Sequence, residues 1–187
     1  MKRFNGAVVV ALMLALVVPA GASTFVAMSR HELVSQSDAV VQGRVLKVSS
    51  FWGQEGRVIM TEALVQVEEK IRGNAPSVVV VRTFGGTVNG YTVEAHGFPK
   101  FAVNERLVLF LQNSNETAEV TGYQQGQYRI VRDKSGVDIA VSAVDGGATL
   151  LGRDGRAVTM PKAMRLDALK NLIRADVERP SSGRTAN

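Results

Sequence analysis

Short apolar runs separated by turn residues recur between residues 38 and 159, and this regular spacing constrains the fold more than any other feature. Valine and other β-branched residues are frequent in the runs, and such residues favour strands. Glycine, asparagine and proline separate the runs, and these residues favour turns. The runs span residues 38–48, 61–68, 77–83, 91–93, 106–112, 127–132, 137–141, 149–151 and 157–159. Strands at this spacing predict a mainly β fold, either a meander or a barrel.

Three runs carry more specific signals. Residues 106–112 (RLVLFLQ) are the most hydrophobic strand candidate and predict the core strand. Residues 77–83 (SVVVVRT) are apolar on both faces, which is typical of a central strand covered on both sides. Gly43 interrupts the run over residues 38–48 and predicts a bend or bulge there.

Turn residues predict three hairpins. Asn89 and Gly90 are typical of a tight turn that reverses the chain into the next strand. Residues 133–136 and 153–155 are expected to close two more hairpins. The strands joined in this way are 127–132 with 137–141, and 149–151 with 157–159.

A helix is expected at each end of the strands. Ser29 and Glu32 have the spacing of a capping box, which predicts a short helix running to Ser37. Pro161 is expected to open a longer amphipathic helix, which Pro180 ends. Its apolar residues at helical spacing are Met164, Leu166, Leu169, Leu172, Ile173 and Val177.

The first 22 residues predict a cleavable export signal. Lys2 and Arg3 supply a basic start, residues 7–18 are wholly apolar, and residues 20–22 (AGA) form a small-residue cleavage site. The alternative is an uncleaved membrane anchor, for which the apolar segment is short. We therefore expect a periplasmic or secreted protein without stable membrane insertion.

Beyond residues 1–22, the organisation is expected to be simple. Residues 23–179 are long enough for a single domain, and residues 180–187 predict a disordered tail. Removing the signal lowers the formal net charge from +5 to +3, and the basic residues are scattered, so nucleic acid is not an expected partner. The chain contains no cysteine, so no disulfide can brace the fold.

Catalytic motifs are lacking in the sequence. It contains no Gly-x-Ser-x-Gly elbow, no Ser-x-x-Lys, no phosphate loop and no zinc-protease helix. His31 and His96 could share a metal only if the fold brought them together with a carboxylate such as Glu94. We therefore predict no catalytic residue, metal or cofactor. The open alternative is a hydrolase that uses strand carboxylates, for which the candidates are Glu62, Glu68, Glu69 and Glu94.

Residues 83–101 (TFGGTVNGYTVEAHGFPKF) combine glycines with aromatic residues between two hydrophobic strands. Glycine permits close backbone approach and aromatic rings give rigid contact area, which together suit a binding loop. The alternative is a packed connection whose aromatic rings plug one end of a barrel. Residues 49–56 are expected to form a neighbouring loop that carries Phe51 and Trp52. The candidate binding residues are Trp52, Phe84, Gly85, Gly86, Tyr91, His96 and Phe98.

Four segments resemble the netrin-module family, which includes the tissue inhibitors of metalloproteinases. In order they are residues 37–45 (SDAVVQGRV), 70–73 (KIRG), 78–83 (VVVVRT) and 101–111 (FAVNERLVLFL). The same pattern is similar to that of uncharacterised exported bacterial proteins. The resemblance implies an OB-like β-barrel, and it implies a protein that binds another exported protein.

The sequence departs from the inhibitors at their working end. In that family a mature amino-terminal cysteine chelates the zinc of the target protease, whereas Ser23 stands at the predicted end here. Asn104 also replaces the usual glycine before Glu105.

The expected protein is mainly β, with an OB-like barrel, a short N-terminal helix and a C-terminal amphipathic helix. Its expected role is that of an exported, non-enzymatic binding or structural module whose partner is another exported protein. The alternatives are a protease inhibitor of netrin-module type and a carboxylate-dependent hydrolase.

Overall fold

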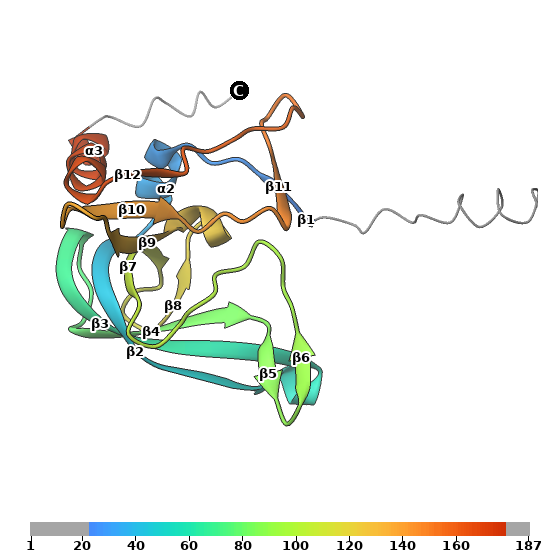
Figure 1. Ribbon diagram of the computed structural model, residues 1–187. Helices are drawn as coiled ribbons and strands as arrows, with labels where there is room; N and C mark the ends of the chain where they lie inside the picture. Colours follow the sequence, from blue (N-terminus) through green and yellow to red (C-terminus); the bar gives the residue numbers. More distant parts are fainter. Residues whose placement is uncertain (1–22, 179–187) are drawn as a thin grey trace, which may run out of the picture.

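The computed structural model describes residues 23–178, and most of its elements are strands (Figure 1). The first half contains β1 (Ser23–Val26), α2 (Arg30–Gln36), β2 (Ala39–Gly53), η1 (Gln54–Gly56), β3 (Val58–Gly73), β4 (Val78–Phe84), β5 (Gly86–Val88) and β6 (Tyr91–Val93). The second half contains β7 (Arg106–Gln112), β8 (Thr117–Val120), η2 (Tyr123–Gly126), β9 (Gln127–Arg132), β10 (Asp138–Ser142), β11 (Ala148–Leu151), β12 (Ala163–Arg165) and α3 (Leu166–Glu178). The predicted signal (1–22) and tail (180–187) lie outside the described residues.

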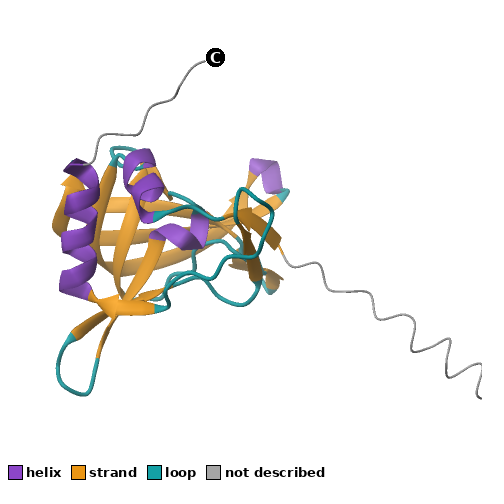
Figure 2. Ribbon diagram, turned by 90° about the horizontal axis from the view of Figure 1, so that it is seen from above, coloured by secondary structure: helices purple, strands orange, loops and turns teal. Residues whose placement is uncertain are grey.

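One large sheet organises the molecule, with the strand order β12-β10-β9-β7-β2-β3-β4-β8. β7 also pairs with β8, so hydrogen-bonded pairs follow a circuit through β2, β3, β4, β8 and β7. All pairs in this circuit are antiparallel except β4 with β8, which is parallel. The helices α2 and α3 lie next to each other on one side of the curved sheet, where α3 packs against β10 and β12 and α2 packs against β7 (Figures 1 and 2).

β7 is the core strand, which confirms the prediction from its sequence. Leu107, Leu109 and Leu111 pack into the core enclosed by β2, β3, β4 and β8. Val108 and Phe110 face the other way, into the core beneath α2 and α3. Both faces of β7 are therefore buried, because the helices cover the face that the strands leave open. Each such side chain contributes about 1.5–3 kcal/mol through removal of apolar surface from water.

β2 bends where the sequence predicts. The β2–β3 register shifts between Gln42 and Gly43, and a Cβ at Gly43 would lie only 2.6 Å from the carbonyl oxygen of Gln66. The predicted loop over residues 49–56 is wrong, however, because β2 continues to Gly53. Its final residues pair in register with the start of β3, so a long hairpin replaces most of the loop.

The helix at α2 is capped as predicted. The backbone N–H of Glu32 donates to Ser29 Oγ (3.2 Å), and the backbone N–H of Ser29 donates to Glu32 Oε2 (2.7 Å). The predicted start of the second helix at Pro161 is wrong. Residues Ala163–Arg165 pair with β10 as β12, and α3 begins only at Leu166.

The apolar stripe of α3 is narrower than predicted. Leu166, Leu169 and Ile173 are buried beneath the helix, whereas Leu172 and Val177 are exposed. The sheet and α2 therefore cover only part of the stripe that the sequence suggests.

Two strand predictions are also wrong. β4 is not covered on both sides: Val79 and Val81 point into the core, whereas Val78 is 40% exposed, because the helices cover a different part of the sheet. The hairpin predicted around residues 153–155 is reduced to a single bridge between Leu151 and Ala157. The main partner of β11 is instead β1, in a parallel pair.

Candidate functional site

The β5–β6 hairpin lies across one end of the long β2–β3 hairpin. Asn89 and Gly90 form its turn, as predicted, and both adopt positive φ. At Gly86, a Cβ would lie 2.3 Å from Thr61 Oγ1 and 2.4 Å from Ser50 Oγ. Only glycine therefore allows the backbone to approach these two hydroxyls so closely.

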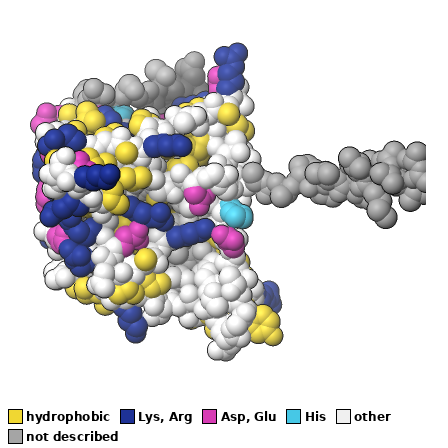
Figure 3. Space-filling view, viewed as in Figure 1, with side chains coloured by type: hydrophobic (Ala, Val, Ile, Leu, Met, Phe, Trp, Pro, Cys, Tyr) yellow, Lys and Arg dark blue, Asp and Glu magenta, His cyan; other side chains and the backbone are white. Residues whose placement is uncertain are grey.

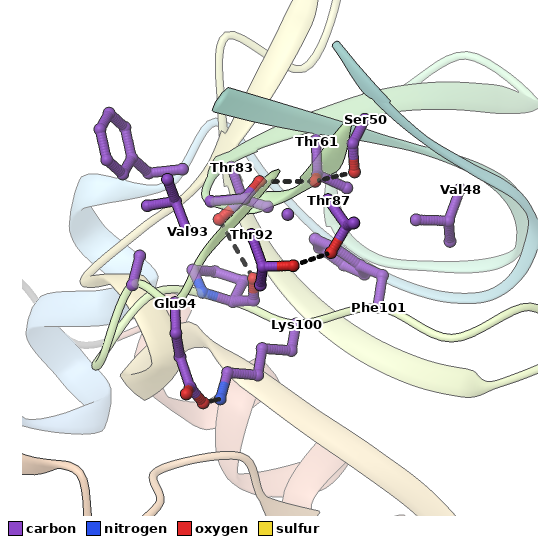
Figure 4. Close-up of a pocket in the computed structure, with 15 residues that line it drawn as sticks. Val48, Ser50, Thr61, Thr83, Thr87, Thr92, Val93, Glu94, Lys100 and Phe101 are labelled. Carbon is purple, nitrogen blue, oxygen red and sulfur yellow. Dashed lines mark hydrogen bonds and ion pairs between the residues drawn. The ribbon is translucent and has the colours of Figure 1, made fainter. Parts of the chain in front are cut away.

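A pocket of about 440 Å³ lies between this hairpin and the ends of β2, β3 and β4, and we call it the mouth pocket (Figure 4). This volume is within the range of small-molecule sites. Its lining residues are Val48, Ser50, Thr61, Thr83, Phe84, Gly85, Gly86, Thr87, Thr92, Val93, Glu94, Ala95, Pro99, Lys100 and Phe101.

The mouth pocket is rich in hydroxyl groups that bond to one another or to backbone oxygens (Figure 4). Thr61 Oγ1 donates to the carbonyl oxygen of Gly85 (2.7 Å) and lies 2.8 Å from Ser50 Oγ. A hydroxyl has one proton, so Ser50 must be the donor to Thr61. The hydroxyls of Thr87 and Thr92 form a second pair, 2.9 Å apart.

One basic group at the rim, Lys100, faces two carboxylates. Lys100 Nζ lies 3.0 Å from Glu94 Oε1 and 3.8 Å from Asp145 Oδ2. The hydrogen bond from Lys100, followed by its charge and that of His96, lowers the pKa of the Glu94 carboxyl. Burial raises the pKa of Asp145, but hydrogen bonds from Gln124 and from a backbone N–H, together with the charges of Lys100 and His96, outweigh it and lower that pKa. Both carboxyls are therefore ionised at neutral pH.

An exposed aromatic pair stands beside the mouth pocket. The rings of Trp52 and Tyr91 meet edge to face, with centroids 6.0 Å apart. Trp52 is 42% exposed and Tyr91 is 68% exposed. Trp52 lies two residues from Ser50 on β2, so both side chains share the face that carries the pocket. Hydrophobic side chains are visible in this region of the space-filling view, at the lower right (Figure 3).

The structure separates the other predicted binding residues from this pair. Phe84, Gly85 and Gly86 line the mouth pocket. Phe98 belongs to a packed aromatic cluster with Phe25, Phe84 and Tyr123, where its closest ring centroid is that of Tyr123 at 4.9 Å. For the part of residues 83–101 around Phe98, the alternative interpretation therefore applies: its aromatic ring packs within the protein.

The two histidines occupy different parts of the molecule. His31 lies on α2. His96 belongs to the connection between β6 and β7, and it lies beside Gly147, which belongs to the connection between β10 and β11. Within residues 23–178, no group of three or more His, Cys, Asp or Glu side chains is arranged to hold a metal ion.

The carboxylates proposed for a hydrolase have separate basic partners. Glu94 is the member of this set that lines the mouth pocket. The partners are Arg82 for Glu62, Arg44 and Arg106 for Glu68, Lys170 and Arg174 for Glu69, and Lys100 for Glu94.

A second set of ion pairs covers the outer face of the sheet, where basic and acidic side chains are interspersed (Figure 3). Asp138 accepts from Arg132 Nε (2.9 Å) and from Arg106 Nη1 (2.8 Å). These hydrogen bonds, that from Arg132 first, lower the pKa of Asp138 to about 2. This network joins β7, β9 and β10, and it lies outside the mouth pocket.

Sequence reasoning missed the polar lining of the mouth pocket. The missed residues are Ser50, Thr61, Thr83, Thr87, Thr92 and Lys100. The available signal was the repeated occurrence of hydroxyl residues near strand ends, but threonine is also an ordinary strand residue.

The fold and the site define a mainly β protein with an exposed aromatic pair beside a hydroxyl-lined pocket. The chain matches no known protein family, and comparison with curated proteins and with solved structures likewise finds no match. The netrin-module resemblance therefore stays a prediction. Neither helix within residues 23–178 is long and apolar enough to span a membrane.

Proposed function

We propose that this protein is an exported, non-enzymatic binding module with an OB-like barrel, and that it binds its ligand at the mouth pocket. The observation that carries the proposal is the exposure of Trp52 and Tyr91 directly beside a pocket of about 440 Å³. Large aromatic side chains standing in solvent next to a concave site are typical of a binding surface.

The strand pairing supports the OB-like barrel. An OB-fold is a five-stranded, partly open Greek-key barrel. The circuit through β2, β3, β4, β8 and β7 contains five strands and includes one parallel pair, between β4 and β8. Fold alone does not define function, so the binding role rests on the site.

The charge of Glu94 supports binding over general-acid catalysis. The pKa of Glu94 is lowered, so this side chain is ionised at neutral pH and is not suited to act as a general acid. Its carboxylate is also held by Lys100.

Ligand retention tests the proposal without assuming a ligand. The chain from Ser23 onward is immobilised and exposed to the extracytoplasmic fraction of its own organism, and retained molecules are identified by mass spectrometry. We expect a compound or protein to be retained by the unsubstituted chain and lost from the double variant W52A/Y91A. Tyr91 is largely exposed and Trp52 is partly exposed, and neither belongs to the buried core, so the double variant should stay folded.

A matched control removes exposed apolar side chains elsewhere. Val131 on β9 and Leu172 on α3 are 47% and 38% exposed, and the variant V131A/L172A should retain the same molecules. Equal retention by all three proteins would contradict binding at the mouth pocket.

A further inference from the structure

We propose that the ligand of the mouth pocket is a neutral saccharide. This inference rests on the proposed function and adds the chemical class of the ligand. It depends on three features of the pocket. These are its hydroxyl groups, the ion pair in its lining, and the apolar surface that lies next to its polar surface.

The hydroxyl protons of the pocket are nearly all committed. Thr61 donates to Gly85 O, Thr83 donates to Pro99 O (3.1 Å), and Ser50 donates to Thr61. One proton of the Thr87 and Thr92 pair joins these two residues, which leaves one proton free. The lining therefore offers mainly acceptor lone pairs, and it favours a ligand that brings several donors.

The charge of the lining argues against an anionic ligand. Its acidic and basic side chains are Glu94 and Lys100, and they pair with each other at 3.0 Å. A phosphate or sulfate group would meet one lysine that already has a carboxylate partner. A neutral ligand with hydroxyl groups can donate to the lone pairs without separating this ion pair.

Apolar and polar surfaces lie next to each other at the site. Val48 and Phe101 contribute apolar wall to a pocket whose remaining surface carries the hydroxyls (Figure 4). The exposed rings of Trp52 and Tyr91 extend this apolar surface outside the pocket. A sugar ring has the matching character, because its C–H groups form apolar faces and its hydroxyls point outward from the ring edge. The pocket volume suits about one or two such rings.

The test uses Trp52, which is the only tryptophan in the sequence, so its fluorescence reports on the site directly. The chain from Ser23 onward is titrated with neutral tetrasaccharides built from glucose, mannose or N-acetylglucosamine, and with a sulfated heparin tetrasaccharide. We expect saturable change in Trp52 emission with at least one neutral tetrasaccharide and none with the heparin fragment. Calorimetry with the same sugar checks the affinity.

Two variants connect the binding to the geometry. Tyr91→Ala should weaken binding of that sugar about tenfold because it removes one ring of the exposed aromatic pair. Ser50→Ala should weaken it about fivefold because it removes an acceptor, and Val131→Ala should leave it unchanged.

The failure of this inference is distinguishable from failure of the binding function. Lack of response to every neutral sugar at concentrations on the order of 10 mM, or a response to heparin alone, would overturn the saccharide assignment. If the retention experiment still identified a ligand that depends on Trp52 and Tyr91, the binding function would stand with a ligand of another class. Sugar binding that Tyr91→Ala and Ser50→Ala leave unchanged would also overturn the assignment.

Discussion

The guanidinium Nε of Arg30 lies 2.6 Å from Oδ2 of Asp176, and this ion pair joins α2 to α3. The Asp176 side chain is 1% exposed, whereas that of Arg30 is 28% exposed. Replacing Arg30 by alanine removes a hydrogen-bonded partner of opposite charge from a carboxylate in a poorly solvated position.

Arg30→Ala should therefore lower the free energy of unfolding by about 2–4 kcal/mol. The matched control is Arg165→Ala, which removes a salt bridge to Asp167 in which both side chains are more than half exposed. That change should cost less than about 1 kcal/mol. Urea unfolding followed by circular dichroism measures both, and equal losses would contradict the structural role of the Arg30 pair.

The contact between Phe25 and Gly97 predicts that a methyl group is not tolerated at position 97. Gly97 has φ +82°, and a Cβ there would lie 2.1 Å from the Phe25 ring. Gly97→Ala should cost more than about 2 kcal/mol, because steric overlap adds to backbone strain. Gly136 has φ +79° with nothing within 4 Å of its Cβ position, so Gly136→Ala should show the strain alone, about 1 kcal/mol.

A double-mutant cycle separates the cost of steric overlap with Phe25 from the cost of backbone strain at position 97. In the Phe25→Ala background the overlap is gone, so Gly97→Ala should cost only about as much as Gly136→Ala. If thermal unfolding shows the same loss in both backgrounds, the ring contact is not the cause.

The lowered pKa of the Asp138 carboxyl predicts a specific loss of stability in acid. Its folded pKa of about 2 lies below the ordinary aspartate value of 3.8, so folding favours the ionised form. The contribution is complete above the unfolded pKa and is lost as pH falls from about 4 through about 2. The difference in unfolding free energy between the unsubstituted chain and Asp138→Asn should therefore be constant above pH 5 and shrink toward pH 2. A difference that grows on acidification would have the wrong sign for this linkage.

The edge-to-face contact between Tyr91 and Trp52 predicts a spectral change in the absence of ligand. Tyr91→Ala should shift Trp52 emission to longer wavelength, because the indole loses a neighbour and gains water contact. Val131→Ala, on β9, should leave the spectrum unchanged. Identical spectra for Tyr91→Ala and the unsubstituted chain would contradict the packing of the pair.

The elements that could be predicted from the sequence are those with local causes. Ser29 and Glu32 cap α2 through contacts three residues apart, and Asn89 with Gly90 supplies the positive φ that its turn requires. The five consecutive apolar residues within Arg106–Gln112 require burial on both faces of the strand, whichever strands are its neighbours, and all five are buried.

The elements that were missed depend on distant partners. The sequence of Ser49–Gly53 has no apolar alternation, and it becomes strand because the start of β3 pairs with it. Residues Ala163–Arg165 become β12 only through β10.

The candidate site was predictable in part, for the same reason. The exposed aromatic residues Trp52 and Tyr91 could be proposed from their turn-rich neighbourhoods. The hydroxyls of Ser50, Thr61 and Thr83 could not, because three separate strands bring them together.

The parallel pairing of β1 with β11 also has a consequence for the order of folding. The two strands come from nearly opposite ends of the described chain, so they can meet only after almost everything between them has been made. Contacts of this kind carry a large loop-closure entropy and form slowly. We expect β1, the first strand of the described residues to be synthesised, to be among the last to dock, with Phe25 exposed until then.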